Sequence, residues 1–164
     1  GSKNHGAINS YVKVGKDTVQ VMNCYLESNR LTSKDKDITK WEKDNDPIKE
    51  IYNKLSDAAE KRRKQAEQVV SKKNNKIPSI VCGDMNDTPI SYTYQQISNL
   101  LNNAYEESGT GLGISFNRKG FPVRIDHIFT SNGLKSARTF VNAKISSSDH
   151  RPIITNIYKS PKGK

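Results

Sequence analysis

Residues 77–87 read "IPSIVCGDMND", a short apolar run that ends at Gly83 and continues into an acidic loop. This pattern predicts a buried β-strand that delivers Asp84 and Asn86 to the end of a sheet. A lone carboxylate in such a place costs free energy unless a cation, a metal or a hydrogen bond compensates it. The stretch therefore indicates both a sheet-based fold and a place to look for chemistry.

The flanking segments predict the rest of the sheet and one long helix. Residues 9–14 alternate, and residues 17–26 are more apolar, which predicts a hairpin leading into a buried strand. A long amphipathic helix is predicted from an Asp46 N-cap, with Pro47 at its first position, to "KKNN" at 72–75. Its apolar residues are Ile48, Ile51, Leu55, Ala59, Ala66, Val69 and Val70.

Towards the C-terminus, residues 92–103 have the pattern of a second, shorter helix. Three strands are predicted at 123–129, 136–145 and 151–158. Strands that alternate with two helices indicate an α/β class, with a sheet packed on helix.

The length of 164 residues predicts one domain. We assign residues 1–2 to a tag remnant, residues 3–158 to the domain and residues 159–164 to a basic tail. Because no methionine starts the domain, we expect a fragment of a longer parent. No apolar run is long enough to cross a bilayer, so we expect a soluble fragment, whereas the parent's compartment (cytoplasmic, secreted or membrane-attached) stays open.

The formal net charge of +10 is compatible with nucleic acid or phosphorylated substrates, but lysines scattered along a helix and the tail demonstrate neither. Cys24 and Cys82 match no zinc spacing, and a buried free thiol is the simplest expectation for each.

Acidic residues recur at the ends of apolar strands. Asp84 follows "SIVCG", Asp126 lies in "RIDHIF", and Asp149 precedes "HRPIITNIY". One such residue is often a structural cap, but a recurring placement predicts a shared site at one end of the sheet. The residues that would join them are Asn23, Asn86 and His150.

These residue types suit hydrolysis of phosphate esters. Carboxylate and amide oxygens are ligands that Mg²⁺ or Mn²⁺ prefers, and the metal offsets charge on the phosphoryl oxygens. Asp126 would hold the tautomer of His150. Asp149 adjoins His150 in sequence, so on an extended strand the two side chains point to opposite faces, and Asp149 better suits a metal site.

The ordered set "MNCYLES", "VCGDMND", "RIDHIF" and "SSSDHRPI", within residues 8–158, resembles the endonuclease/exonuclease/phosphatase superfamily, which has the deoxyribonuclease I-like fold. The resemblance implies the C-terminal half of a four-layer α/β sandwich, with a mixed, mainly antiparallel sheet and one long and one short helix packed on it. It implies that Asp84 and Asn86 orient the attacking water, that Asp126 supports the catalytic His150, and that Asp149 binds metal.

The resemblance also assigns Asn23 and Tyr25 to the phosphate contact. Many members have a histidine at the position of Tyr25, so the alternatives are contact through the hydroxyl or a weakened site. The N-terminal half, which supplies an Asn and a metal-binding Glu in the family, has no counterpart in residues 1–22. His5 and Glu27 are poor substitutes, and we expect a flexible-terminus residue and a solvated acid.

We therefore expect a fragment, inactive by itself, of a divalent-metal-dependent phosphoesterase, a nuclease or a phosphatase. The alternatives are a non-catalytic basic module that binds nucleic acid or another partner, and a degenerate relative. Substrates implied by the resemblance are nucleic acid, a phospholipid head group or a sugar phosphate, with Phe116 and Asn117 in the rim loop 109–121 suited to contact them. The expected partners are the missing half and a second copy, which would form a homodimer through an exposed sheet face.

Overall fold

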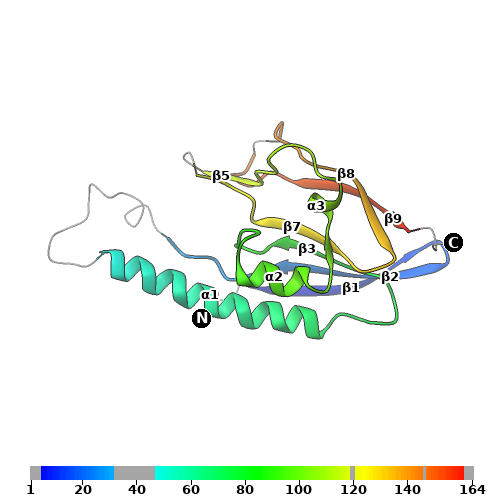
Figure 1. The fold of residues 1–164 in the computed structure, drawn as a ribbon, viewed down its shortest axis with the longest axis horizontal. Helices are drawn as coiled ribbons and strands as arrows, with labels where there is room; N and C mark the ends of the chain where they lie inside the picture. Colours follow the sequence, from blue (N-terminus) through cyan, green and yellow to red (C-terminus); the bar gives the residue numbers. More distant parts are fainter. Residues whose placement is uncertain (1–4, 32–46, 119–120, 146, 161–164) are drawn as a thin grey trace.

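The computed structural model describes residues 5–31, 47–118, 121–145 and 147–160. A five-stranded sheet in the order β1-β2-β3-β7-β4 forms its centre (Figure 1). Its strands are β1 (Gly6–Val14), β2 (Asp17–Tyr25), β3 (Ser79–Asp84), β4 (Asn102–Asn103) and β7 (Asp126–Thr130). Two ribbons, β5 (Phe116–Arg118) with β6 (Phe121–Val123) and β8 (Leu134–Val141) with β9 (Ile153–Lys159), are separate from it.

The sheet is mixed. β2 and β3 are parallel, whereas β1 pairs with β2, and β7 pairs with β3 and β4, in antiparallel fashion. A parallel pair needs a long crossover, and α1 (Pro47–Ser71) lies between β2 and β3 in the chain. The helices α2 (Tyr92–Ser98) and α3 (Ala104–Ser108) follow. The predicted mixed α/β class is confirmed.

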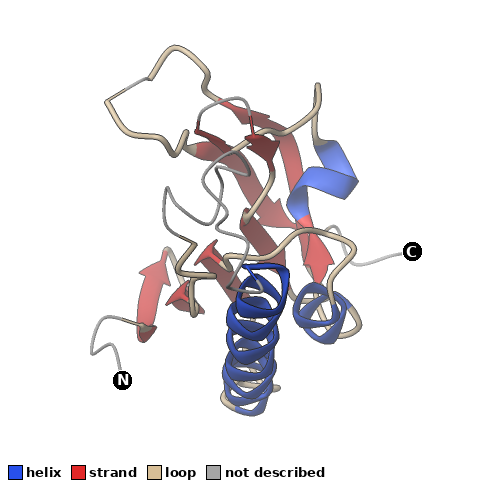
Figure 2. Cartoon of the chain, turned by 90° about the vertical axis from the view of Figure 1, so that its left-hand side faces the viewer, coloured by secondary structure: helices blue, strands red, loops and turns tan. Residues whose placement is uncertain are grey.

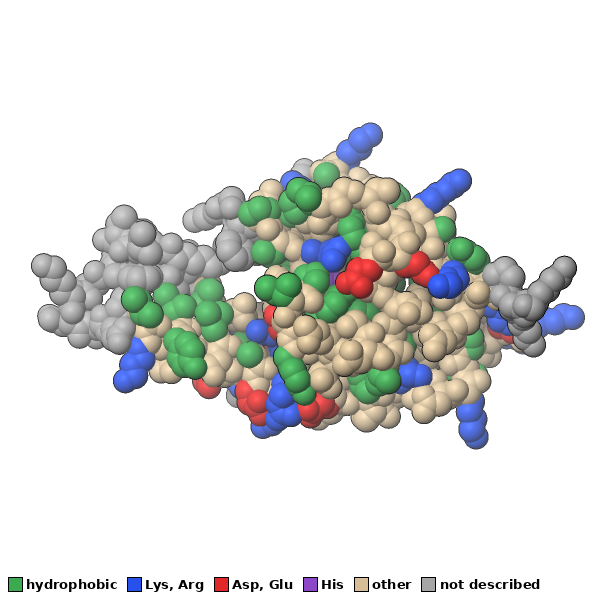
Figure 3. Space-filling model, viewed as in Figure 1, with side chains coloured by type: hydrophobic (Ala, Val, Ile, Leu, Met, Phe, Trp, Pro, Cys, Tyr) green, Lys and Arg blue, Asp and Glu red, His purple; other side chains and the backbone are tan. Residues whose placement is uncertain are grey.

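The long helix has buried residues from Ala58 onwards, whereas its first turns are more exposed. Among the residues of the predicted apolar face, Ala66 and Val69 are buried, whereas Ile48 is 66% exposed and Leu55 is 38% exposed. The first turns of α1 extend past the end of the sheet, so no strand lies above them (Figure 1), and hydrophobic atoms show on this part of the surface (Figure 3). The predicted N-cap, Asp46, lies outside the described residues.

The second helix is shorter than the predicted span of 92–103. α2 begins after Ser91, whose hydroxyl accepts a hydrogen bond from Tyr94 N, and it ends at Ser98. The chain leaves the helix because Asn102–Asn103 pairs with β7 as β4. The side chain of Asn103 then caps α3 by accepting hydrogen bonds from two backbone N–H groups.

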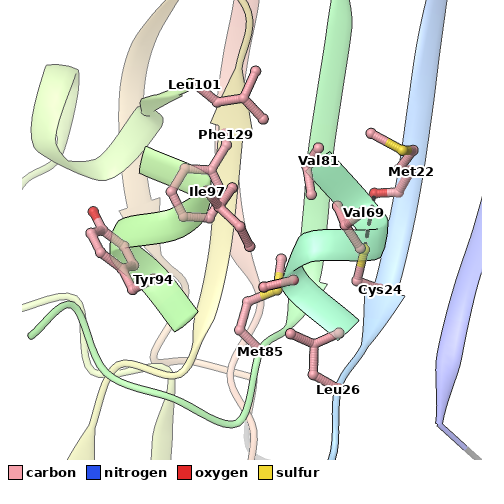
Figure 4. Packing of buried hydrophobic residues seen from close by; sticks show 11 residues of the cluster. Met22, Cys24, Leu26, Val69, Val81, Met85, Tyr94, Ile97, Leu101 and Phe129 are labelled. Carbon is pink, nitrogen blue, oxygen red and sulfur yellow. Dashed lines mark hydrogen bonds between the residues drawn. The ribbon is translucent and has the colours of Figure 1, made fainter. Parts of the chain in front are cut away.

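The core lies between the sheet and the helices α1 and α2. Alternate residues of β2 and β3 point into it, and Phe129 of β7 and Ile97 of α2 are fully buried there. In Figure 4 the labelled side chains from β2, β3 and β7 lie together with those from α1 and α2. The cluster consists of Met22, Cys24, Leu26, Ala66, Val69, Val81, Met85, Tyr94, Ile97, Leu101 and Phe129.

The opposite face of the sheet is only partly covered. The β8–β9 ribbon lies on this side, across the sheet from α1 and α2 (Figures 1 and 2). On β1, however, Ile8, Val12 and Val14 are 68%, 44% and 60% exposed. Within the described residues, no helix is long and apolar enough to cross a membrane.

Candidate active site

Strand register brings three predicted site residues into one row. Tyr25, the last residue of β2, pairs with Asp84, the last residue of β3, and Asp84 pairs with Asp126, the first residue of β7. Side chains of directly paired residues leave the sheet on the same side. This side is the face opposite the core, because the core residues Cys24 and His127 are their sequence neighbours.

Gly83 and Asn86 shape the turn that presents Asp84. Gly83 has a φ of +131°, and a Cβ there would lie 2.0 Å from the carbonyl oxygen of Cys24, so only glycine fits. Asn86 adopts a φ of 49°, and its backbone N–H donates to Asp84 Oδ1 at 2.8 Å. The Asn86 side chain donates to the carbonyl oxygen of Leu26 at 2.9 Å, which ties the turn to the end of β2.

Asp84 is held in a partly desolvated position. Burial raises the pKa of its carboxyl from 3.8 to about 6, against the lowering effect of the Asn86 N–H and with a further raising effect of the charge on Asp126. The side chain is 16% exposed. A carboxylate with this pKa is a proton acceptor better matched to neutral pH than an ordinary aspartate.

His150 faces both acids. Its Nδ1 lies 2.9 Å from Asp126 Oδ2, and its Nε2 lies 3.9 Å from Asp84 Oδ2. If Nδ1–H donates to the Asp126 carboxylate, Nε2 is left directed at the space beside Asp84. The structure thus places a carboxylate, an oriented imidazole and a second, partly desolvated carboxylate in one group.

The segment around Phe116 supports this histidine. The backbone of residues 115–117 runs beside residues 149–151, with Arg151 N donating to Ser115 O at 2.7 Å and Asn117 N donating to Asp149 O at 3.1 Å. The Phe116 ring meets the His150 ring edge-on, with centroids 4.9 Å apart. Phe116, predicted to contact substrate, therefore packs against the imidazole.

The other predicted residues surround the group. Asn23 lies two residues before Tyr25, so its side chain leaves β2 on the same face, where it is exposed. Tyr25 is 43% exposed. Asn117 and Asp149 are exposed beside the site, and Asp149 is not among the clustered metal-ligand atoms described below.

The expectations for His5 and Glu27 were wrong. Glu27 is 5% exposed, and its carboxylate lies 3.0 Å from His5 Nδ1 and 2.6 Å from Arg30 Nη2. The cations Arg30 and Lys61, the latter at 3.7 Å, compensate the buried charge. The His5 side chain is 7% exposed, and its ring lies 4.8 Å from that of Tyr25.

Asp84, Asp126 and His150 could hold a metal ion. One ligand atom from each residue lies within 4.8 Å of the others. Two carboxylates with one imidazole are a donor set that Mn²⁺ accepts, and the carboxylates also suit Mg²⁺. The chemistry of these donors therefore fits the predicted divalent cation.

Two supporting residues escaped prediction from the sequence. Ser115, which is fully buried, accepts hydrogen bonds through its hydroxyl from the backbone N–H groups of Ile125 and Asp126, at 3.1 Å each. Nothing in its sequence context distinguishes it from a loop serine. Arg62, 4% exposed, could have been found from the sequence. It is a charged residue at the helical spacing of Ala66 and Val69, on the buried side of α1.

The model of the Endonuclease/Exonuclease/phosphatase family matches residues 12–150, so the chain belongs to this family. Its members are phosphoesterases, among them nucleases and phosphatases. This membership confirms the resemblance drawn from the four sequence motifs. No curated protein matches the chain in sequence.

Solved structures share the fold. An endonuclease/exonuclease/phosphatase from Bacteroides vulgatus is 24% identical, with a TM-score of 0.55, over 63% of this chain and 46% of that one. A humanized D. rerio TDP2 is 14% identical, with a TM-score of 0.66, over 93% of this chain and 60% of that one. The human Nocturnin catalytic domain is 17% identical, with a TM-score of 0.57, over 96% and 54% respectively. The chain thus spans about half the length of these structures.

Proposed function

We propose that this chain is the C-terminal part of a divalent-metal-dependent phosphoesterase that hydrolyses a phosphodiester or a phosphomonoester. The observation that carries the proposal is the group of Asp84, Asp126 and His150, with Nδ1 of the histidine 2.9 Å from one carboxylate and Nε2 3.9 Å from the other. Membership of a family of phosphoesterases supports it.

Each residue has a distinct role in this proposal. Asp84, with its raised pKa, accepts a proton from the attacking water, and Asn86 fixes the Asp84 carboxylate through its backbone N–H. His150, oriented by Asp126, directs Nε2 at the phosphoryl oxygens. Asn23 and the hydroxyl of Tyr25 contact the phosphate from the neighbouring strand.

The metal ion proposed here is Mg²⁺ or Mn²⁺. Asp84 and Asp126 supply clustered carboxylates, and Asp149 is an exposed carboxylate next to His150 that completes the acidic rim. When bound, such an ion offsets the charge that develops on the phosphoryl oxygens. Phosphorylated substrates of the proposed enzyme are nucleic acid, a phospholipid head group or a sugar phosphate.

The proposed site is incomplete within this chain. The site face is uncovered along β1, where Ile8 and Val14 are mostly exposed, and the chain spans about half the length of the solved structures that it resembles. We propose that an N-terminal half covers this face and completes the site, and that without it a second copy of the chain can occupy the face.

The test compares phosphodiester hydrolysis by this chain and by a longer protein that includes the preceding half, with Mg²⁺ or Mn²⁺ present. We expect turnover in the longer protein and little or none in the chain alone. Equal turnover per mole would refute the idea of a half site, and no turnover in either protein with any class of substrate would refute the proposed function.

A further inference from the structure

Arg62 of α1 contacts both segments that follow the site strands. Its Nη1 donates to the carbonyl oxygen of Glu27 at 2.9 Å and to Asn29 Oδ1 at 2.8 Å, just after β2. Its Nε donates to Asp87 Oδ2 at 3.0 Å, just after β3. One guanidinium therefore joins the segment after Tyr25 to the turn that presents Asp84.

The contacts around Arg62 make this junction rigid. The side chain is 5% exposed, so its bonds are formed away from water, where a charge-assisted hydrogen bond is strong. The carbonyl oxygen of Asp87 is held separately by His127 Nε2, at 3.0 Å. Leu26 N also donates to Asp84 O at 3.0 Å, so the two strand ends are bonded to each other directly.

We infer that Arg62 is a positioning residue of the active site, which sets the distance between the phosphate contacts on β2 and the Asp84 turn on β3. This role rests on the proposed function. Arg62 touches no substrate, since it lies on the helix side of the sheet and Tyr25 and Asp84 leave the sheet on the other side. It acts through the backbone of the two segments.

The planar fork of arginine is required for the role. Nε and Nη1 point at different segments at the same time, which a lysine ammonium on a flexible stem cannot reproduce with fixed geometry. Arg62→Lys keeps the buried charge but loses the simultaneous contacts. It therefore separates the positioning role from simple compensation of Asp87.

The first test is turnover in the longer protein that includes the preceding half. A shift of about 1 Å in a reacting group costs up to about 100-fold in rate. We expect Arg62→Gln to lower kcat by about 10- to 100-fold with KM changed by less than about twofold, and Arg62→Lys to restore part of the loss. The neighbouring Arg63→Gln is the matched control, because the ion pairs of Arg63 among the described residues are with Glu60 and Glu67 on the exposed side of α1.

A purely structural role predicts a different pattern. Val69→Ala destabilises the same helix from within the core but removes none of the hydrogen bonds that Arg62 makes to the two segments. The two variants are compared at temperatures at which equal fractions are unfolded. The inference is overturned if Val69→Ala lowers kcat as much as Arg62→Gln does. It is also overturned, while the proposed function survives, if Arg62→Gln leaves kcat unchanged and Asp84→Ala abolishes turnover.

The second test uses this chain alone and does not depend on activity. Backbone hydrogen exchange at Leu26 N and Asn86 N reports whether the two segments stay joined. We expect exchange at both amides to accelerate by about tenfold or more in Arg62→Gln and to be unchanged in Arg63→Gln. Unchanged exchange in Arg62→Gln would overturn the inference even if the protein hydrolyses phosphate esters.

Discussion

Two ionisable side chains, Asp84 and His127, make opposite contributions to stability as the pH changes. Burial raises the pKa of Asp84 from 3.8 to about 6, whereas burial lowers the pKa of His127 from 6.5 to about 4. The folded chain therefore takes up a proton on Asp84 more readily than the unfolded chain, and on His127 less readily. The two effects overlap between pH 4 and pH 6 and nearly cancel.

Asp84→Asn is expected to stabilise the chain at neutral pH. The ionised Asp84 costs about 3 kcal/mol above pH 6, a cost that disappears as the pH falls towards 3.8. Relative to wild type, the variant should gain about 2.5 kcal/mol more in the free energy of unfolding at pH 8 than at pH 4, where about half of Asp84 in the unfolded chain is still ionised. Urea unfolding with a chelator at both values measures this difference, and Asp57→Asn, an exposed carboxylate of α1, is the control. The same difference in both variants would refute the prediction.

His127→Gln is expected to protect the chain against acid. The buried imidazole is 1% exposed, and its Nδ1 has no hydrogen-bond partner among the described residues, so a proton there is unfavourable. In the wild type, neutral His127 makes its full contribution to the free energy of unfolding above pH 6.5. This contribution falls by about 3 kcal/mol as the pH drops to 4. Glutamine can still donate to Asp87 O but does not titrate. The variant should lose this acid-dependent part of the unfolding free energy, and an unchanged pH profile would contradict the account.

At the scale of elements, the two ends of α1 contribute differently to stability. Val69 is buried against the sheet, whereas Leu55 is 38% exposed on the part that extends past it. Val69→Ala removes two buried methyl groups, so we expect a loss of about 1.5–2 kcal/mol, and Leu55→Ala should cost less than about 0.5 kcal/mol. Urea unfolding of the two variants at neutral pH measures the contrast, and equal losses would mean that the exposed turns are covered in solution.

The same helix shows what a sequence pattern can predict. The spacing of Ala66 and Val69 identified the helix and its inner face, because a period of 3.6 residues is a local property. It could not show that the sheet ends before Ile48 and Leu55, which depends on strands distant in the sequence. The second helix was overextended for the same reason, since pairing of Asn103 with Phe129 decides where it ends.

For the molecule as a whole, the exposed sheet face predicts self-association. Val12 lies on the site face of β1 and is 44% exposed, and its neighbour Tyr11 points to the other face and is 58% exposed. We expect light scattering at high concentration to show dimers, and Val12→Lys to shift them towards monomers more than Tyr11→Lys does. A wild-type monomer at high concentration would contradict this expectation.

The sequence could predict that the site residues lie together where they stand at the ends of strands. Asp84, Asp126 and His150 were placed together because apolar strands deliver their ends to one edge of a sheet. The contacts of the buried Glu27 with His5 and Arg30, and the hydrogen bonds of Arg62 to two segments, depend on how a helix and loops pack, which no local pattern encodes. Not every cation of α1 is free to bind a polyanion, since Arg63 pairs with Glu60 and Glu67.

The central claim is that Asp84 and His150 perform chemistry on a phosphate ester. The most direct test is the double substitution Asp84→Ala and His150→Ala in the longer protein, with hydrolysis of a phosphodiester and binding of the same substrate measured side by side. We predict that turnover falls by at least about 1,000-fold while binding changes by less than about tenfold. Unchanged turnover, or a loss of binding that accounts for the whole effect, would contradict the claim.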